Sequence, residues 1–475
     1  MSKKNKKIVL ILITLLVISG LFFNPNIKKV IRNNIPADIY QRISFTKKLI
    51  LNQDFGFYRY EEVVESNFSK IKNFIYDENF SFKVNRKYKR VDDNKSFQIY
   101  QLPPLFPAVR SNHVNSSYMD FHDNNIIYAS KNGVFFKVVI NLDNLEFFPV
   151  KSNLNDFFTT TLRPRNASIN YYNANTISKF GVKDIHIDDD IIYLSYIEEF
   201  DKYGYNTSIL KAKMNDSLVF EKLFSSKKYI SSDYKEFYPI QSGGRIVKFV
   251  EDSLLFSVGD YRDRLKAQDM TSDNGKILSV NRFNGGSRII SLGHRNPQGL
   301  DYNFEYDRIV STEHGPNGGD EVNFNIESKT LKNFGWPISN YGYHYGEENA
   351  INDSHYADNT RVIEGSPLYK SHAEYGFIEP IKYWNKNPAV SEVKFINNDK
   401  NFSEFVVSTL GYDTIDRPDA QHLIHYKYDI KLDSLEIINK YYVGERIRDL
   451  IFDEKNHMLF FTGETNGVIG SIGVK

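Results

Sequence analysis

The sequence predicts an all-β chain, a six-bladed β-propeller preceded by an N-terminal hydrophobic helix. Two observations carry this prediction. A polar turn followed by a short apolar strand recurs six times, and successive copies lie roughly 50 to 65 residues apart, with one wider gap of about 100. A long apolar run also stands near the start of the chain. A β-sandwich is the structural alternative, but it would not require a regular period of this length.

The first 24 residues predict a signal anchor or a signal peptide. Four lysines among the first seven residues precede a charge-free, apolar stretch from Ile8 to Phe23. That stretch is short for a spanning helix, which needs about 20 residues, and slightly long for the core of a cleaved signal. A retained anchor and a cleaved signal both predict export to the periplasmic or extracellular face, and an anchor adds a membrane contact. A buried core helix is the remaining alternative.

Residues 25–112 are predicted to form a stalk and lead-in segment. Their composition is mixed, and prolines at 103, 104 and 107 mark a boundary near their end. The propeller is predicted to occupy residues 113–475. The six strand copies within it are Asn124–Gly133, Asp189–Tyr196, Glu251–Asp260, Tyr306–Glu313, Ser403–Leu410 and Lys455–Glu464. Each is short, rich in β-branched or aromatic residues and bounded by turn-forming residues.

Composition excludes several classes of function. The 475 residues carry a formal net charge of only +1, which argues against a nucleic-acid partner. The chain has no cysteine, so disulfides, thiolate nucleophiles and cysteine-based metal sites are excluded. Hydrophobic residues make up 41% of the chain, which is enough for a large core.

Three sequence blocks follow one another in the second half of the chain. They are GHRNPQGL at 293–300, EHGPNGGDE at 313–321 and NFGWP at 333–337. In this order they resemble the cofactor-binding signature of the soluble quinoprotein sugar dehydrogenases, the glucose/sorbosone dehydrogenase family. Shorter matches are GGRI at 243–246, NGKIL at 274–278 and GERIRD at 444–449. The resemblance implies a propeller that oxidises aldose sugars to lactones with pyrroloquinoline quinone (PQQ) and Ca²⁺.

The residue types are suited to such a cofactor. PQQ is a planar tricarboxylate, and a guanidinium binds a carboxylate in bidentate fashion. Arg446 and Arg448 are two residues apart, so on a strand both project from one face. Arg295 and Asn296 stand together in a Gly/Pro-rich loop. The alternative for the C-terminal pair is an ion pair with Glu445, Asp449 or a neighbouring blade.

The resemblance assigns roles to further positions. The residues matching cofactor-binding positions are Arg295, Asn296, His314, Asp320, Arg446 and Arg448. Gly315 and Pro316 match positions whose carbonyls bind the Ca²⁺ of the quinone, and carbonyl oxygens are ligands that Ca²⁺ prefers. Glu321, with the carbonyl of Phe334, matches a second, structural Ca²⁺ site.

The chain departs from the family at two other positions, Gln241 and Gly411. The family has a catalytic histidine four residues before the arginine of the Gly-Arg segment, and here that residue is Gln241. Glutamine can hydrogen-bond a hydroxyl but cannot act as a general base near neutral pH. Gly411 stands where the family has a lysine. His344, His355 or His372, all in the long segment after residue 337, could replace the missing base.

Three functions remain open on the sequence alone. The first is a PQQ- and Ca²⁺-dependent sugar dehydrogenase with Gln241 in the place of the catalytic base. The second is a non-catalytic propeller that still binds a quinone, a sugar or Ca²⁺. The third is a membrane-tethered scaffold for a protein partner, because a fold alone does not fix a function. The particular sugar and the oligomeric state are not predicted.

Overall fold

The computed structural model describes residues 81–90, 96–102, 116–157 without 132 and 142, 181–199, 204–230 without 228, 241–344 without 251, 365–412 and 417–474 without 466. All of them belong to the second of two compact units, residues 72–475. Their helical elements are short 3₁₀ turns, η1 (Leu154–Asp156), η3 (Arg264–Ala267) and η6 (Ala373–Tyr375). The predicted N-terminal helix, residues 1–24, lies outside them. No helix among the described residues has the length and apolar character needed to cross a membrane.

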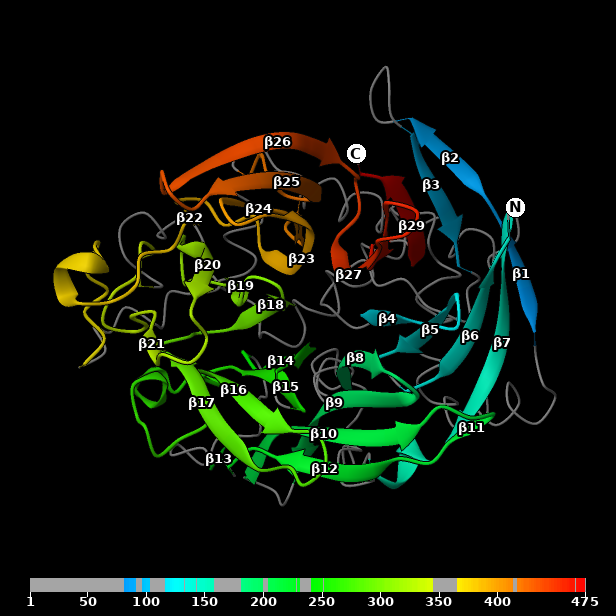
Figure 1. The fold of residues 1–475 in the computed structure, drawn as a ribbon, viewed down its shortest axis with the longest axis horizontal. Coiled ribbons are helices and arrows are strands. Elements are labelled where there is room, and N and C mark those ends of the chain that lie inside the picture. Colours follow the sequence, from blue (N-terminus) through cyan, green and yellow to red (C-terminus); the bar gives the residue numbers. More distant parts are fainter. Residues whose placement is uncertain are drawn as a thin grey trace, which may run out of the picture. The chain divides into compact units, whose positions relative to one another are not determined.

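The described strands form six sheets of mainly antiparallel strands (Figure 1). Blade 1 contains β4 (Ser117–His122), β5 (Asn125–Ser130), β6 (Phe135–Ile140) and β7 (Asn144–Ser152). Blade 2 contains β8 (Val182–Asp188), β9 (Ile191–Glu199), β10 (Gly204–Lys213) and β12 (Glu221–Ser225). Blade 3 contains β14 (Gly243–Phe249), β15 (Ser253–Val258), β16 (Lys276–Asn281) and β17 (Ser287–Leu292). Short strands β11 (Ser217–Leu218), β13 (Tyr229–Ile230) and β21 (Lys332–Asn333) pair with β7, β10 and β17.

The remaining three sheets complete the set. Blade 4 contains β18 (Pro297–Asn303), β19 (Arg308–Glu313), β20 (Asp320–Ile326) and β22 (Lys382–Trp384). Blade 5 contains β23 (Val390–Asn398), β24 (Phe402–Thr409), β25 (His422–Asp429) and β26 (Ser434–Tyr442). Blade 6 contains β27 (Ile447–Asp453), β28 (Met458–Gly463) and β29 (Val468–Gly473), followed in space by β3 (Ser96–Gln101) and β2 (Lys87–Arg90).

The first strands of the six blades form a closed ring. In order around the ring, β4 contacts β8, β8 contacts β14, β14 contacts β18, β18 contacts β23, β23 contacts β27, and β27 contacts β4. Figure 1 shows the sheets arranged around this ring. The six-bladed β-propeller predicted from the repeat is therefore confirmed.

The second strands are the elements that the sequence pattern had located. Each of the six predicted copies overlaps the second strand of one blade, namely β5, β9, β15, β19, β24 and β28. Both faces of such a strand pack against a neighbouring blade, and β15 and β19 are buried at every position. Five apolar clusters fill the spaces between successive blades from blade 1 to blade 6.

Part of the predicted lead-in segment forms strands of the propeller sheets. β1 (Phe82–Asn85) pairs with β7 at the outer edge of blade 1, and β3 pairs with β29 in blade 6. The pairing of β3 with β29 therefore joins the beginning of the described chain to its last blade, which closes the ring through backbone hydrogen bonds. β1 and β2 lie at sheet edges, whereas β3 lies between β2 and β29 and buries Phe97.

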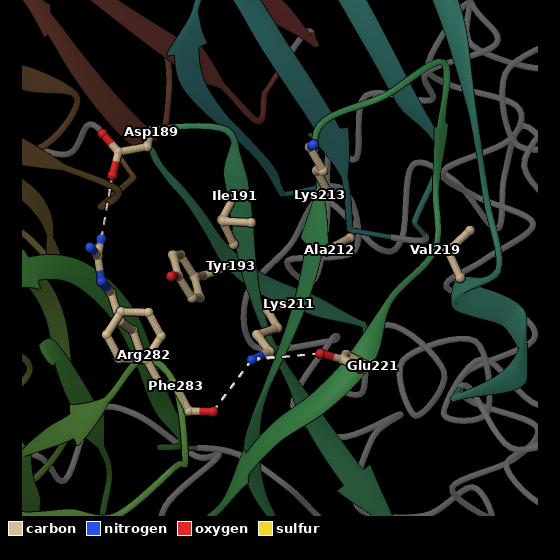
Figure 2. Close-up of a pocket in the computed structure, with 10 residues that line it drawn as sticks. All are labelled: Asp189, Ile191, Tyr193, Lys211, Ala212, Lys213, Val219, Glu221, Arg282 and Phe283. Atoms are coloured by element: carbon tan, nitrogen blue, oxygen red, sulfur yellow. Dashed lines mark hydrogen bonds and ion pairs between the residues drawn. The ribbon is translucent and has the colours of Figure 1, made fainter. Parts of the chain in front are cut away.

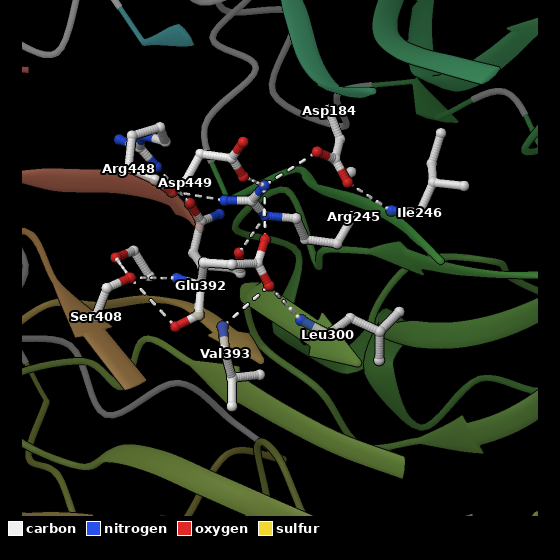
Figure 3. A network of polar contacts seen from close by, with 12 residues as sticks. Asp184, Arg245, Ile246, Leu300, Glu392, Val393, Ser408, Arg448 and Asp449 are labelled. Carbon is white, nitrogen blue, oxygen red and sulfur yellow. Dashed lines mark hydrogen bonds and ion pairs between the residues drawn. The ribbon is translucent and has the colours of Figure 1, made fainter. Parts of the chain in front are cut away.

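One arginine occupies the centre of the ring (Figure 3). The guanidinium of Arg245 on β14 forms ion pairs with Asp184 (3.0 Å), Glu392 (2.7 Å) and Asp449 (2.6 Å), which come from blades 2, 5 and 6. It also donates to the backbone carbonyls of Gln298 and Arg448. All four charged side chains of the network are buried.

The same carboxylates join neighbouring blades through the backbone. Asp184 accepts the N–H of Ile246 (2.8 Å), Glu392 accepts the N–H of Leu300 (3.1 Å), and Asp449 accepts the N–H of Met119 (2.7 Å). The three acids and Arg245 are each the third residue of a first strand, at or beside a break in the strand register. A bulge redirects a side chain and interrupts pairing, so here it frees backbone N–H groups for the next blade.

Removing this cation should destabilise the whole ring. We expect Arg245→Met to lower the free energy of unfolding by on the order of 3–5 kcal/mol, because three buried carboxylates lose their counter-ion. Chemical denaturation monitored by circular dichroism measures the change. Lys266→Met is the control, since Lys266 makes only a half-exposed pair with Asp269 on the surface, and its removal should change stability by less than about 1 kcal/mol. An Arg245→Met variant as stable as the parent would contradict a central role for the network.

Candidate functional site

The sequence-predicted site residues gather at one end of the channel. In each blade the first strand begins, and the second strand ends, at the same end of the ring. Gln241 precedes β14, Arg295 and Asn296 precede β18, and Arg446 precedes β27. The segment 314–319 follows β19. Strand topology thus brings together residues that are up to about 200 positions apart in the sequence.

Arg295 and Asn296 are fixed by their own surroundings. The backbone N–H of Arg295 donates to Glu313 (2.6 Å), and its guanidinium donates to the carbonyl of His314 (2.8 Å). The same guanidinium lies 5.4 Å from the ring centroid of Trp336. Asn296 Oδ1 accepts from Gln298 (2.9 Å) and faces the N–H of Gly243 (3.3 Å). Both side chains are buried, so their orientation is set before any ligand binds.

Gln241 connects this arginine to a buried acid. With its carboxamide oriented to satisfy both neighbours, Gln241 donates to Asp260 Oδ1 (2.8 Å) and accepts from Arg295 Nη2 (2.9 Å). Its backbone has a positive φ of 59°, which is unusual for a side chain other than glycine and places it at a sharp turn before β14. The residue at the predicted catalytic position therefore lies within the predicted cofactor-binding cluster.

Arg446 and Arg448 share one carboxylate. Glu464 accepts from Arg448 Nε (2.6 Å) and lies 3.4 Å from Arg446 Nη2. Arg446 also donates to the carbonyl of Leu410, and its guanidinium lies 4.8 Å from the ring centroid of Tyr412. The ion-pair alternative for the two arginines is confirmed, with Glu464 as a carboxylate that both of them contact. Two guanidiniums therefore meet at one carboxylate.

Gln298 links the two groups of basic residues. Its amide nitrogen donates to Asn296 (2.9 Å), and its oxygen accepts from Arg448 Nη1 (2.9 Å). A continuous hydrogen-bonded chain therefore runs from Asn296 through Gln298 to Arg448 and Glu464. The predicted cofactor-binding residues from blades 4 and 6 thus belong to one arrangement.

The loop after β19 carries the predicted calcium ligands. Asp320 Oδ1 accepts the N–H of Gly315 (3.0 Å), and Asn387 Nδ2 donates to the carbonyl of Pro316 (2.8 Å). His314 hydrogen-bonds the carbonyl of Val390 through Nε2 (2.6 Å). A carbonyl oxygen has two lone pairs, so the bond from Asn387 leaves Pro316 able to accept a second partner. The two carbonyls are compatible with a Ca²⁺ ion.

Burial changes the charge of the acids at this end of the channel. Burial raises the pKa of Asp260 to about 6, although the Arg295 guanidinium and the N–H of Arg262 act in the opposite direction. Burial likewise raises the pKa of Asp320 to about 7 against hydrogen bonds from the backbone of Gly315 and Val390. Both carboxyls thus carry less negative charge near neutral pH than exposed aspartates do.

This donor set fits an anionic, planar cofactor such as PQQ. Three buried guanidiniums and two amide side chains converge from blades 4 and 6, with aromatic rings at Trp336 and Tyr412 beside two of the guanidiniums. Guanidiniums bind carboxylates through paired hydrogen bonds, so a cluster of them favours an acid over a neutral ligand. Arg295, Asn296, Arg446 and Arg448 are the residues that would hold the carboxylates.

The surroundings of Glu321, in contrast, do not fit the second calcium ion. Glu321 Oε1 accepts Asn340 Nδ2 (2.8 Å) and lies 3.5 Å from His372 Nε2, and Oε2 lies 3.4 Å from Asn323 Nδ2. Burial alone would lower the pKa of His372, but its bond to Glu321 and the nearby Glu379 and Glu313 carboxylates raise it. N–H groups and an imidazole that favours its cationic form surround this carboxylate, where Ca²⁺ needs oxygens.

The two loop histidines that the structure describes, His344 and His372, have partners other than Gln241. His344 Nδ1 is 2.9 Å from Arg264 Nη1, and His372 packs beside Glu321 with its ring stacked on Tyr341. His355 lies outside the described residues. Within the described part of the chain, no cluster of three or more histidine or acidic side chains could hold a metal ion.

A separate pocket of about 400 Å³ lies at the other end of the blades (Figure 2). It is lined by β9, β10 and the turns that hold Asp189 and Arg282, where the hairpins of blades 2 and 3 reverse direction. Lys211 pairs with Glu221 (3.5 Å), and Arg282 lies 3.7 Å from Asp189. None of the predicted site residues lines this pocket, and its charges are largely paired with one another.

Three further acids belong to the candidate site and were not identified from the sequence. Asp260 and Glu464 each form the last residue of a predicted strand copy, and Glu313 ends a third copy. All three lie beside arginines or the backbone of Arg295 at the mouth of the channel. An acidic residue recurring at the end of three repeat copies is the signal that could have located them.

A family model matches most of the propeller. The model described as glucose/sorbosone dehydrogenase matches residues 173–470. An aldose sugar dehydrogenase of Escherichia coli is 30% identical over 226 residues, which are 44% of this chain and 54% of that protein. The quinoprotein glucose dehydrogenase B of Acinetobacter calcoaceticus is 28% identical over 205 residues, 36% of this chain and 42% of that protein. The chain thus spans about half the length of the curated relatives it matches.

Solved structures agree on the fold. The crystal structure of the soluble aldose sugar dehydrogenase from Escherichia coli, in its apo form, superposes with a TM-score of 0.53 at 20% identity. The superposition covers 77% of this chain and 99% of that one. At this level of identity the likeness supports the propeller fold and its blade order.

The environment of Glu321 generates a testable expectation about calcium. We expect Glu321→Gln to leave the affinity and stoichiometry of Ca²⁺ binding unchanged, because N–H groups already satisfy this carboxylate. Isothermal titration calorimetry of Ca²⁺ into the parent and the variant, each with PQQ present, measures both quantities. A variant that loses one bound Ca²⁺ per chain would show that the site does take the ion after rearrangement.

Proposed function

The chain belongs to the glucose/sorbosone dehydrogenase family, and on that premise we propose that it binds PQQ and acts on a sugar at the mouth of its channel. The observation that carries the proposal is the hydrogen-bonded chain that joins Asn296, Gln298, Arg448 and Glu464, with Arg446 on the same carboxylate and Arg295 next to Asn296 in the sequence. Guanidiniums gathered in one buried place favour a ligand with carboxylates, because they bind it through paired hydrogen bonds. A tricarboxylate cofactor is such a ligand.

Each residue of the cluster has a separate task in this proposal. Arg446 and Arg448 hold carboxylates from one side and Arg295 with Asn296 from the other, while Trp336 and Tyr412 keep the guanidiniums in place. The carbonyls of Gly315 and Pro316 are the oxygens offered to Ca²⁺, and Asp320 holds their loop through the N–H of Gly315. His314 is anchored by the carbonyl of Val390 and faces the cofactor only as a positioned ring. When bound, PQQ with Ca²⁺ would supply the electron-accepting carbonyl for oxidation of the sugar C1 hydroxyl.

In this proposal the chain lacks the histidine that removes the proton from the sugar in the family. Gln241 can orient the C1 hydroxyl, but its carboxamide neither accepts nor releases a proton near neutral pH. Asp260, whose pKa is raised to about 6, lies 2.8 Å from the Gln241 amide and is the nearest described carboxylate to it. Asp260 is fully buried and also accepts a hydrogen bond from Trp336 Nε1 (2.9 Å), so it would take a proton from the sugar only after a local opening.

The second candidate is a propeller that binds quinone or sugar without catalysis. Gln241 at the position of the base favours it, because the anion-holding residues are intact while the proton acceptor is missing. A protein partner at the same mouth belongs to this alternative too. Both candidates place the site on the exported side of a membrane, a proposal supported by the lysines that precede the apolar run Ile8–Phe23.

Binding of the cofactor is the first expected outcome. We expect the purified chain lacking residues 1–24 to bind PQQ with micromolar or tighter affinity, and more tightly with Ca²⁺, because three guanidiniums face its carboxylates. Quenching of intrinsic fluorescence during titration with PQQ, with and without Ca²⁺, measures this. Arg448→Met should weaken binding by about tenfold or more, and Lys266→Met, which removes an ammonium paired with Asp269 on the surface, should not. No binding at micromolar PQQ would remove the dehydrogenase proposal.

The second outcome separates an enzyme from a binding protein. We expect Gln241→His to raise sugar-dependent reduction of an artificial electron acceptor by about 10²-fold or more, since a positioned base contributes that much. Dye reduction with glucose and other aldoses, measured with PQQ and Ca²⁺ present, gives the rate. A parent chain that is already as active as the variant would show that another group removes the proton. An inactive variant that still binds PQQ would favour the non-catalytic alternative.

A further inference from the structure

Four exposed tyrosines lie in the segments that pack against the loop after β19. Tyr343, Tyr369, Tyr375 and Tyr383 have exposed fractions of 39%, 41%, 43% and 39%. They belong to residues 338–344 and 365–384, which follow the NFGWP block and end in β22 at the edge of blade 4. In those described ranges no other large hydrophobic side chain is exposed to this degree. We call this set the tyrosine surface.

The rings are held in fixed positions. Tyr369 and Tyr375 stack with centroids 3.9 Å apart and planes 3° apart. Tyr383 stacks on Tyr341 at 3.7 Å and 6°, and Tyr341 stacks in turn on buried His372 at 5.4 Å and 16°. The Tyr341 hydroxyl donates to Glu379 (2.7 Å), which itself accepts the N–H groups of His372 and Ala373. Tyr383 is therefore the outer end of a stacked column whose inner end is in the core.

The tyrosine surface is joined directly to the candidate site. The backbones of Tyr343 and Asn317 exchange two hydrogen bonds, of 2.8 and 3.1 Å, and Asn317 belongs to the loop of the predicted calcium ligands. Gly342 packs so close to this loop that an added Cβ would lie 2.4 Å from the carbonyl oxygen of Gly318. In β22, Tyr383 pairs with Glu321 and Trp384 pairs with Asp320. Rigid backbone contacts thus connect the exposed rings to the loop after β19.

The chemistry of the surface matches a neutral polyol. Each large hydrophobic side chain exposed on it is a tyrosine and so carries a hydroxyl. A tyrosine ring offers an apolar face and a hydrogen-bonding edge, which match the C–H face and the hydroxyl rim of a sugar ring. The Lys370 ammonium lies 4.3 Å from the Tyr343 ring centroid and donates to the carbonyls of Asn340 and Gly342, which fixes it beside that ring.

We propose that the tyrosine surface binds a carbohydrate chain whose end enters the candidate site, so that the preferred ligand is an oligosaccharide and not a free monosaccharide. This inference rests on the proposed function, since it names the class of sugar that reaches the same site. Two stacked tyrosine sets beside one channel mouth give successive sugar units successive rings to pack on. Contacts along a chain add to those at its end, so affinity rises with chain length.

The test is direct binding, which requires neither PQQ nor turnover. The full-length chain is titrated calorimetrically with glucose and with hexasaccharides of α-linked glucose, β-linked glucose and β-linked N-acetylglucosamine. We expect at least one hexasaccharide to bind roughly tenfold or more tightly than glucose. Tyr375→Ala and Tyr383→Ala should each weaken that binding by about fivefold, while Tyr383→Phe should retain most of it.

A tyrosine on another blade serves as the matched control. Tyr442→Ala removes a tyrosine of similar exposure, 41%, from the outer strand of blade 5, and should leave binding unchanged. Equal affinity for glucose and every hexasaccharide, or binding that ignores Tyr375 and Tyr383, overturns the proposal. Self-association that disappears in the two alanine variants, measured by sedimentation, would instead identify a second copy as the occupant and also overturns it. Tyrosine-dependent hexasaccharide binding without any dye reduction would support this inference while contradicting the dehydrogenase proposal.

Discussion

The buried ion-pair network of Arg245 is the interaction on which the rest of this propeller depends. A single guanidinium meets carboxylates from blades 2, 5 and 6, bonds the backbone of blades 4 and 6, and lies 5.4 Å from the ring of Tyr118 in blade 1. Burying four ionised groups is costly unless each is paired and hydrogen-bonded, and here each acid also accepts a backbone N–H from an adjacent blade. The ion pairs of Arg245 therefore fix the orientation of the blades relative to one another. The positions of the residues at the mouth of the channel depend on that orientation.

The sequence predicted those strands whose burial produces a recognisable hydrophobic pattern in the sequence. A second strand such as β15 lies between two blades and is apolar on both faces, so it reads as an uninterrupted hydrophobic run. An outer strand such as β26 has mostly exposed positions, and its residues resemble those of a loop. β1 and β3 were assigned to a lead-in segment for the same reason, since their pairing with β7 and β29 depends on chain closure and not on local pattern.

The candidate site was predictable as a set of residues but not as a set of contacts. Arg446 and Arg448 share a strand face, and topology places them opposite Asn296, which the motifs alone could indicate. Their partner Glu464 lies 16 and 18 residues away on the return strand, so only the folded blade shows that both arginines are already paired. His372 is a stronger case: the sequence offered it as a replacement base, whereas the fold buries it beside Glu321, 51 residues earlier in the chain. Ion pairs between residues far apart in the sequence have no characteristic spacing, so the sequence alone does not predict them.

The arrangement also divides the candidate site into two parts. Arg446 and Arg448 are held by the blades themselves, through Glu464, Gln298 and the carbonyl of Leu410, so their positions do not depend on the residue at 241. Gln241 in turn satisfies both of its neighbours: its amide nitrogen bonds Asp260, and its oxygen accepts from Arg295, which would otherwise face a positive imidazolium if a histidine took up a proton there. Glutamine is thus electrostatically compatible with the arginine beside it. Under the proposed function, Gln241 would leave the carboxylate-binding arginines in place without removing a proton from the sugar, so cofactor binding and catalysis would be separable.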